Sequence, residues 1–392
     1  MSDPTAASIS KRLNDQLGIV VLAGGGTAGH VNPLLAVADE LKAWFPAIQI
    51  RVLGTATGLE ADLVPDRGYE LCEIPRVPLP RRPSLDLLKL PFRLRAAIKA
   101  AADVISQPGV DAVVGFGGYV STPAYLAARR AQVPIVVHEQ NARPGLANRL
   151  GARFAAQVGV AFATPKLPHA VRVGLPLRKE IAALANTDRA TARQQSAAEL
   201  GLDPALPTLL VTGGSSGALS LNAAVAAAAG VLLDAGVQVL HLTGKGKDGP
   251  VRCALAGIPG AERYHIREYL PQMHHAFAVA DLVVTRAGAG MVCELAALGL
   301  PAILVPLPVG NGEQRLNAVD LEESGGGIVV ADAKFTHRWV VANIGSLLND
   351  RERLTTMSAA ARSCAVTDAA AQVVGLVDQA VNAAKREGRS RA

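Results

Sequence analysis

Residues 19–30 read IVVLAGGGTAGH, an apolar run that ends in glycines and continues into a helix-like stretch. A short buried strand, a glycine turn and a helix form the opening of nucleotide-binding α/β units. The same arrangement returns at residues 208–217, which read TLLVTGGSSG. This repetition predicts an α/β protein with two Rossmann-like domains.

The order of apolar and periodic segments supports that division. The strand-like runs IQIRVLG, DAVVGFGG and VPIVVHEQ alternate with helix-like stretches in the first half, and VQVLHLTG, DLVVTRAG and PAILVPLP follow in the second. Such alternation favours parallel sheets covered by helices. The rhythm breaks over residues 167–208, so we predict domains at residues 18–175 and 176–355. Residues 356–392 read as a helix with a basic tail.

Composition places the chain among globular proteins. It has 392 residues, of which 50% are hydrophobic and 18% charged, and a formal net charge of +6. The four cysteines lack the spacing of a disulfide framework or a zinc site. The polar N-terminus lacks the apolar core of a signal peptide, and no apolar run is long enough to span a bilayer, so we expect a cytoplasmic protein. The positive charge favours anionic partners without choosing among phosphates, nucleic acid and acidic lipid.

Two glycine loops occur in the first half. Gly24–Gly29 fits the G-x-G-x-x-G pattern, in which glycine lets the backbone approach a diphosphate at a helix N-terminus. The acidic residue that an NAD site needs about 20 residues later is missing, because the second strand ends in Arg51–Thr55. The second loop, Gly115–Tyr119, is equally compatible with a tight turn that binds nothing. Two such loops in one domain favour an anion site.

The second half offers polar groups that suit a nucleotide sugar. Gly213–Gly217 adds serine hydroxyls for phosphate oxygens, although serine is also a preferred helix N-cap. Glu294 has a carboxylate that can accept two hydrogen bonds from a ribose diol, and a solvent-facing glutamate is the alternative. Gln314 and Asn317 share one helix face, where amides bind sugar hydroxyls or simply stay exposed.

Two side chains of the first half suit proton transfer. His30 closes the first glycine loop, and Glu139 belongs to the segment HEQN that follows a predicted strand. Histidine titrates near neutral pH and serves as a general base, although a single histidine more often has a structural role. The chain has no D-x-D to hold a metal–diphosphate pair, and we expect neither a metal nor another cofactor. The absence of G-x-S-x-G and of a P-loop argues against hydrolase and NTPase chemistry.

Basic and apolar residues alternate between residues 76 and 95. The members that face a membrane in this interpretation are Arg81, Arg82, Leu85, Leu88, Lys89, Phe92 and Arg93. Such a mixture suits docking on an anionic bilayer, where each basic residue near the surface contributes about 1 kcal/mol. A solvated helix face above ordinary core leucines is the alternative.

Eight sequence blocks resemble, in the same order, the motifs of glycosyltransferase family 28. They are GGGTAGH, GFGGYVSTP, HEQN with PGLANR, GLPLRKE, GGSSGA, EYLPQM, RAGAGMVCELAALGLPAILVPLP and NGEQRLNA. The blocks run from Gly24 to Asn317, and such a colinear series is far more specific than one glycine loop. The resemblance implies the GT-B fold, in which two facing Rossmann-like domains enclose a cleft. It also implies that the helix within residues 356–392 packs back on the first domain.

The resemblance is to the peptidoglycan branch of the family, and it implies an activity. These enzymes transfer N-acetylglucosamine, with inversion, from UDP-N-acetylglucosamine to the C4 hydroxyl of the muramoyl sugar of undecaprenyl-pyrophosphoryl-MurNAc-pentapeptide (lipid I), which gives lipid II. The implied partners are this donor, this acceptor, an anionic membrane surface, and proteins of cell-wall synthesis and division, with no nucleic acid. The implied location is the cytoplasmic side of the cell membrane, as a peripheral protein.

Matching positions carry the implied roles. The resemblance implies that the donor binds to Arg178, Ser215, Leu270, Ala289, Gly290, Glu294 and Gln314 in the second domain, and to Thr27, Ala28, Gly29 and Asn141 in the first. It implies that the acceptor pyrophosphate binds to Gly25, Gly26, Gly117, Gly118 and Tyr119. The segment from Arg81 to Phe92 matches the membrane-facing region of the family.

Four positions depart from the commonest family pattern, namely Ala28, Thr122, Ser216 and Glu313. Each departure leaves the neighbouring motif residue in place. Glu313 adds a negative charge beside Gln314, so the share of these two residues in sugar binding stays open.

The mechanism that we expect uses His30 as the general base, with Glu139 in reserve. Helix N-termini of the second domain would stabilise the departing UDP in place of a metal. The alternatives are another GT-B glycosyltransferase, a UDP-sugar epimerase, and a non-catalytic nucleotide-sugar sensor or membrane scaffold.

Overall fold

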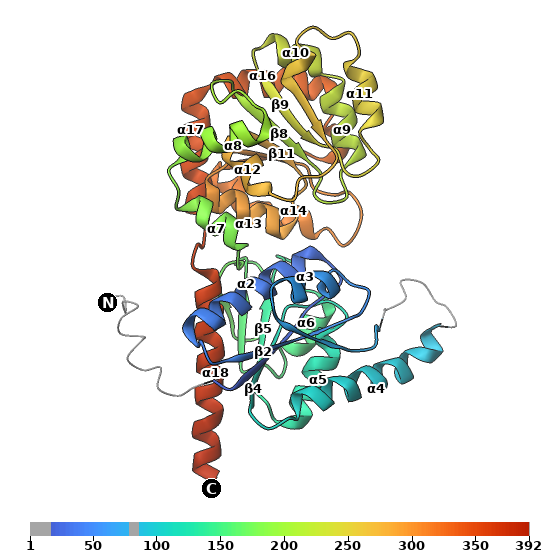
Figure 1. Cartoon of the computed structure of the whole chain (residues 1–392), viewed down its shortest axis with the longest axis vertical. Coiled ribbons are helices and arrows are strands. Elements are labelled where there is room, and N and C mark those ends of the chain that lie inside the picture. Colours follow the sequence, from blue (N-terminus) through green and yellow to red (C-terminus); the bar gives the residue numbers. More distant parts are fainter. Residues whose placement is uncertain (1–16, 78–85, 392) are drawn as a thin grey trace. The chain divides into compact units, whose positions relative to one another are not determined.

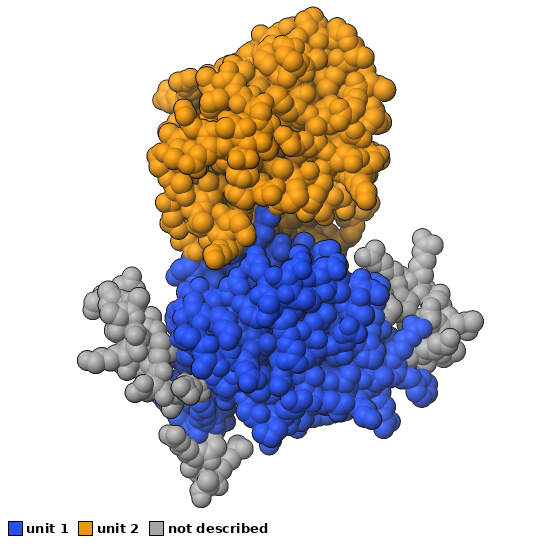
Figure 2. All heavy atoms as spheres, in the orientation of Figure 1, with its two compact units in different colours: residues 1–178, 368–392 blue, residues 179–367 orange. Residues whose placement is uncertain are grey.

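The chain folds into two compact units, which Figure 2 distinguishes by colour. The computed structural model describes residues 17–77 and 86–391, except for the side chains of residues 86–89 and 388–391. Unit 1 comprises residues 1–178 and 368–392, and unit 2 comprises residues 179–367. The expected start of the returning segment, residue 356, falls inside α17 (Arg351–Ser363), which packs on α13, α15 and α16 of unit 2. The chain therefore returns to unit 1 after residue 367.

Unit 1 is built on a parallel sheet in the order β3-β2-β1-β4-β5-β6-β7 (Figure 1). Its strands are β1 (Ile19–Ala23), β2 (Gln49–Gly54), β3 (Glu70–Glu73), β4 (Val110–Gly115), β5 (Ile135–Glu139), β6 (Gln157–Val160) and β7 (Ala170–Arg172). The side chains of β1 alternate between two cores, with Val20 and Leu22 in one and Val21 and Ala23 in the other. Because helices cover both faces, β1 reads as a continuous apolar run.

The helices of unit 1 are α2 (Ala28–Trp44), α3 (Glu60–Asp66), α4 (Asp86–Ile105), α5 (Ser121–Ala131), α6 (Leu146–Gly151) and α18 (Ala369–Arg391). The last of them, α18, packs on α2 and on β4, β5 and β6, as the red helix beside the sheet in Figure 1 shows. Val373 and Val377 are fully buried there in the same core as Val20 and Leu22. The C-terminal helix therefore completes the core of unit 1.

Unit 2 repeats the architecture with a parallel sheet in the order β10-β9-β8-β11-β12-β13. Its strands are β8 (Thr208–Thr212), β9 (Gln238–Leu242), β10 (Tyr264–Arg267), β11 (Leu282–Thr285), β12 (Ala302–Leu304) and β13 (Gly327–Val329). Strand order reverses between β8 and β11 here, and between β1 and β4 in unit 1. Open α/β sheets bind ligands at the carboxyl ends of the strands beside such a reversal.

The helices of unit 2 are α7 (Lys179–Ala185), α8 (Arg189–Leu200), α9 (Leu219–Ala226), α10 (Ala229–Asp234), α11 (Gly249–Leu255), α12 (Met273–Val279), α13 (Ala289–Leu298), α14 (Glu313–Asn317), α15 (Val319–Ser324), α16 (His337–Asn349) and α17, with short 3-10 turns η1 (Ala261–Arg263) and η2 (Asp332–Lys334). None of the helices in the described part of either unit has the length and apolar character needed to cross a bilayer.

Candidate functional site

The loops that follow β1, β4 and β5 line a cavity of about 630 Å³ in unit 1. The cavity lies at the carboxyl edge of the sheet, beside the reversal of strand order between β1 and β4. Nine residues that the sequence assigned to a site line it: Gly25, Gly26, Thr27, His30, Gly117, Gly118, Tyr119, Glu139 and Asn141. Ala28 and Gly29 form the first turn of α2 and are not among the lining residues.

His30 lies in the first turn of α2, with its ring half-buried at the cavity. Its Nδ1 lies 3.0 Å from the hydroxyl of Thr27. Its Nε2 lies beside Gly117, 3.2 Å from the point that a Cβ at that position would occupy. Burial lowers the pKa of His30, and the backbone of Gly25 and the charge of Glu60 oppose that effect. The imidazole is therefore neutral at pH 7 and can accept a proton.

The second glycine loop shapes the space in front of that ring. Gly117 and Gly118 have φ of +91° and +81°, a region that favours glycine. A Cβ on Gly118 would lie 2.6 Å from the carbonyl oxygen of Gly25, so the two glycine loops are in backbone contact. The Ser121 hydroxyl accepts the Gly117 N–H at 2.9 Å and lies 2.9 Å from the Ala23 carbonyl oxygen. Ser121, which the sequence did not single out, thus ties the second loop to β1.

Glu139, the reserve base, is 1% exposed, and both of its carboxylate oxygens accept hydrogen bonds. Oε1 accepts the Asn141 N–H at 2.9 Å, and Oε2 accepts the Gly145 N–H and the Asn148 amide, each at 3.0 Å. Burial raises the pKa of this carboxyl, and these hydrogen bonds act against the rise. The geometry suits a residue that shapes the loop carrying Asn141 better than one that collects a substrate proton.

Asn148 and Tyr125 continue this network and were missed by sequence reasoning. The Asn148 side chain also donates to the His138 carbonyl at 3.1 Å and accepts the Tyr125 hydroxyl at 2.7 Å. Tyr125 is fully buried, in a space that exists because residues 115 and 151 are glycines. His138 is equally buried and binds the Gly174 carbonyl through Nε2 at 2.9 Å, so it is structural. Only the asparagine in the block PGLANR could have signalled this network.

The carboxylate of Glu60 lies beneath the first glycine loop and was also missed. It accepts the Gly26 N–H at 2.9 Å, and the Thr55 N–H and hydroxyl at 3.0 and 2.8 Å. One sequence expectation changes as a result. Gly26 lines the cavity, but its N–H donates to Glu60, so a pyrophosphate contact through that N–H would require this hydrogen bond to break.

The predicted donor residues of unit 2 follow neighbouring strands. Ser215 is exposed in the loop between β8 and α9, Ala289 and Gly290 open α13 after β11, and Gln314 lies in α14 after β12. Because β8, β11 and β12 are adjacent parallel strands, these loops meet at one carboxyl edge. Leu270 follows β10, the edge strand. The topology thus groups the predicted donor residues that belong to unit 2.

The two remaining predicted donor-binding residues, Glu294 and Arg178, belong to different units. Glu294 lies on α13 and is 8% exposed, so the solvent-facing alternative is excluded. Arg178 is the last residue of the first segment of unit 1 and directly precedes α7.

The two amides of α14 have separate roles. Gln314 accepts the N–H of Leu307 through Oε1 at 2.9 Å. Asn317 is fully buried and donates to the Ala287 carbonyl at 3.2 Å. It supports the turn before α13 and is neither an exposed amide nor a sugar ligand.

Arg286 holds the carboxyl edge of unit 2 together. Its guanidinium binds Asp332 at 2.6 Å, the Ser220 hydroxyl at 2.9 Å and the Val305 carbonyl at 3.1 Å. Burial alone would raise the pKa of Asp332, but the hydrogen bonds from Ser220 and Arg286 outweigh it and lower that pKa. The ion pair therefore fixes α9, the end of β12 and η2 relative to one another. Arg286 appeared in the sequence only as the first letter of RAGAG.

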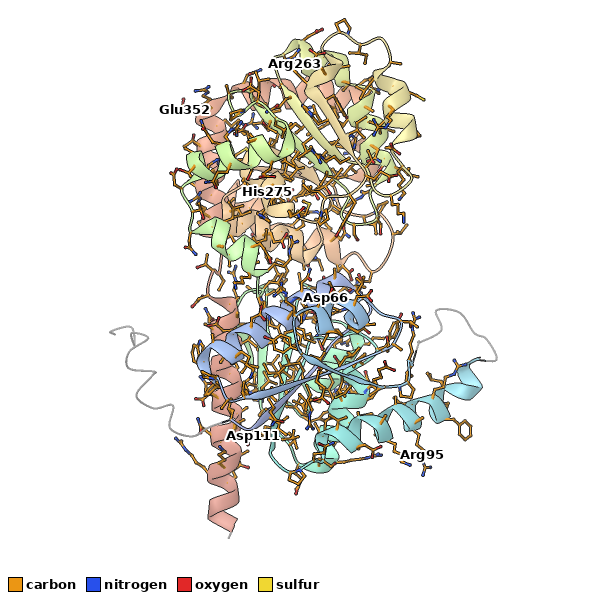
Figure 3. The ribbon with its side chains drawn as sticks, in the orientation of Figure 1. Asp66, Arg95, Asp111, Arg263, His275 and Glu352 are labelled. Carbon is orange, nitrogen blue, oxygen red and sulfur yellow. The ribbon has the colours of Figure 1, made fainter. Side chains whose placement is uncertain are left out.

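The basic and apolar segment is described only in part. Arg81, Arg82 and Leu85 lie outside the described residues, and so do the side chains of Leu88 and Lys89. Phe92 and Arg93 lie on α4, and Phe92 is 78% exposed. Arg95, labelled in Figure 3, is exposed on the same helix.

Comparison with known proteins decides the family. The model of the glycosyltransferase family 28 N-terminal domain matches residues 20–160, and that of the C-terminal domain matches residues 208–373. A relative from Nocardioides sp. is 54% identical over 360 residues, which cover 91% of this chain and 97% of the relative. The chain belongs to glycosyltransferase family 28. The relative is named as a UDP-N-acetylglucosamine–N-acetylmuramyl-(pentapeptide) pyrophosphoryl-undecaprenol N-acetylglucosamine transferase.

Solved structures agree with the assignment to family 28. The crystal structure of Acinetobacter baumannii MurG aligns with a TM-score of 0.73 and 30% identity, over 92% of this chain and 99% of that one. A UDP-N-acetylglucosamine 2-epimerase from Neisseria meningitidis aligns with a TM-score of 0.67 over 92% of this chain and all of that one, but its 14% identity shows a shared fold alone. The predicted family and the α/β fold with two Rossmann-like units are confirmed. The roles of individual site residues remain predictions.

Proposed function

We propose that this chain transfers N-acetylglucosamine from UDP-N-acetylglucosamine to the C4 hydroxyl of the muramoyl sugar of lipid I, with inversion, to give lipid II. The observation that carries the proposal is the 54% identity to a transferase named for this donor and acceptor, over 97% of that relative. The ordered motif blocks support it, because each glycine loop follows a strand at the carboxyl edge of its sheet. We find no observation that favours an epimerase or a sensor.

The donor binds to unit 2 in this proposal. The loop around Ser215 and the N-terminus of α9 receive the diphosphate, because both follow β8 at the carboxyl edge of the sheet, where a helix N-terminus favours an anion. The buried carboxylate of Glu294 accepts hydrogen bonds from the ribose diol. The NH₂ group of Gln314 binds the sugar, and Leu270 meets the uracil through its backbone.

The acceptor binds in the cavity of unit 1. Its wall combines glycine loops with apolar side chains, among them Leu146, which is 69% exposed. Arg76 also lines the cavity, with its guanidinium 5.5 Å from the centre of the Tyr119 ring. The pyrophosphate lies at Gly118, Tyr119 and Arg76, since the Gly26 N–H is already bonded to Glu60.

The chemical step needs a base at the acceptor hydroxyl. The C4 oxygen forms a bond to the anomeric carbon of the donor sugar while the bond from that carbon to UDP breaks. The proton of the hydroxyl passes to Nε2 of His30, which is neutral at pH 7 because burial lowers its pKa. UDP leaves with the electron pair, and N–H groups of unit 2 stabilise its charge.

The lipid-linked acceptor requires access to a membrane surface. Phe92 and the basic residues Arg93 and Arg95 lie on α4, while Leu90 and Leu94 of the same helix line the cavity. We place this side of unit 1 on the cytoplasmic face of the membrane. Apolar residues would enter the interface, and basic residues would contact anionic headgroups.

The proposal is tested with radiolabelled UDP-N-acetylglucosamine and a lipid I analogue. We expect label in the lipid fraction only when acceptor and chain are both present. Label that leaves UDP, or changes its sugar, without any acceptor would indicate an epimerase or hydrolase instead. Donor binding without turnover would indicate a sensor.

A further inference from the structure

The structure holds a buried carboxylate where a phosphate-binding loop is expected to offer only N–H groups. Glu60 is the first residue of α3 and is 0% exposed. Through Oε2 it binds the Gly26 N–H of the loop between β1 and α2, and through Oε1 it binds Thr55 of the loop after β2. One side chain therefore joins the first glycine loop to the neighbouring loop.

Glycines from three segments leave the room that this side chain fills. A Cβ on Gly25, Gly54 or Gly58 would lie 2.5, 2.7 or 2.1 Å from an atom of Glu60. Atoms at such distances overlap, so each of these positions needs glycine as long as Glu60 stays in place. The glycines of the first loop thus serve the packing of a carboxylate as well as the approach of a ligand.

The carboxylate is ionised at neutral pH. Burial alone would raise the pKa of Glu60, but the hydrogen bonds from Gly26 and Thr55 outweigh it, and the pKa is lowered. A negative charge enclosed beneath the loop repels a phosphate that approaches from above. The same charge favours the protonated form of His30, the next ionisable group of that loop.

We propose that Glu60 is the positioning residue for the base: it holds the first glycine loop in place and stabilises the imidazolium that forms when His30 accepts the proton of the acceptor hydroxyl. The inference rests on the proposed function for the identity of that hydroxyl. The inference assigns different roles to the two glycine loops of unit 1. The first loop supports proton transfer, and the second loop with Arg76 receives the pyrophosphate.

Other ionisable groups face the same cavity and must be held constant in a test. They are Glu139 from β5, Arg76 from the segment after β3, and Tyr119 from the second glycine loop. Asn148 lies closest to Gly117 on the α6 side and carries no charge. A substitution at Glu60 leaves all of these groups in place, so a shift in the titration of His30 reports on Glu60.

The decisive experiment is a histidine NMR titration of the full chain, which needs no turnover. The His30 signal is assigned by its absence in His30→Ala. In Glu60→Gln, which keeps the shape and removes the charge, we expect the pKa of His30 to fall by about one unit. Glu70→Gln is the matched control, because Glu70 is a 63% exposed carboxylate of the same unit, and it should leave the His30 pKa unchanged. An unchanged His30 pKa in folded Glu60→Gln would overturn the proposal.

Kinetics supply the second readout. For Glu60→Gln we expect the acidic limb of the kcat/KM profile to move to lower pH and kcat at pH 8 to fall about ten-fold, because the base is weaker. A purely structural residue would change kcat and stability without moving that limb. If Glu60→Gln does not fold, Glu60→Asp keeps the charge on a shorter side chain, and it should lower the His30 pKa by a smaller amount. If the wild type transfers no sugar, the proposed function fails while the NMR titration still decides the role of Glu60.

Discussion

Replacing Glu139 with alanine distinguishes a carboxylate that shapes a loop from one that acts as a base. The substitution removes the acceptor of three hydrogen bonds, which come from Asn141, Gly145 and Asn148. Hydrogen bonds to a charged group contribute about 1.5–3 kcal/mol each. Gly145 is exposed, so water replaces one of them, whereas Asn148 is 2% exposed and Asn141 is half-buried. Because a buried charge is also removed, we expect unit 1 to lose about 3 kcal/mol of its free energy of unfolding.

Tryptophan fluorescence measures this loss in unit 1 alone. The chain has two tryptophans, Trp44 in α2 of unit 1 and Trp339 in α16 of unit 2. In a Trp339→Phe background, the urea transition seen by Trp44 reports on unit 1. Glu73→Ala, at an exposed position at the end of β3, is the control and should change the transition little. A loss below about 1 kcal/mol combined with abolished transfer would refute the reasoning and make Glu139 the base.

Three further predictions concern the site and the buried histidines. Gly117→Ala should lower kcat at least ten-fold without changing UDP binding, since its methyl lies 3.2 Å from His30 and its φ is +91°; calorimetry with UDP checks the second part. Glu294→Ala should raise the KM for the donor about ten-fold and leave the KM for the acceptor unchanged, which initial-rate kinetics measure. Burial lowers the pKa of His138 and of His241 to about 4. The unfolded chain therefore binds more protons below pH 6.5, and each unit should lose up to about 3 kcal/mol of stability between pH 7 and pH 4, as urea transitions at the two pH values would show.

Strands with long apolar runs that are buried on both faces could be predicted from the sequence, whereas the edge strands β3 and β10 and the short interior strand β6 could not. β1 and β8 are apolar throughout because helices cover both faces of each sheet. β3 and β10 are half-exposed edge strands, and their sequences ELCE and YHIR lack that signature. The alanine-rich stretch that begins at Leu219 forms two helices, α9 and α10, with a break after Ala226, and a run of alanines favours a helix but gives no signal for its end.

The functional site, like the strands, could be predicted only where a short local pattern signals it. Glycine loops and strand ends located the cavity of unit 1 and the donor edge of unit 2, because parallel strands place their carboxyl ends together. Glu60, Asn148 and Arg286 were missed, since each acts through partners distant in the sequence. Glu60 lies 34 residues from Gly26, and Arg286 lies 46 residues from Asp332. Local sequence patterns do not reveal such pairs. The sequence analysis therefore assigned Gly26 to the pyrophosphate site without accounting for its hydrogen bond to Glu60.

The most direct test of the central claim is the structure of the product, determined by NMR after incubation of the chain with UDP-N-acetylglucosamine and a lipid I analogue. The proposed mechanism predicts one new β linkage from the sugar to the C4 oxygen of the muramoyl residue, formed at a greatly reduced rate by His30→Ala. An α linkage, a linkage at another hydroxyl, or unchanged turnover by His30→Ala would contradict it.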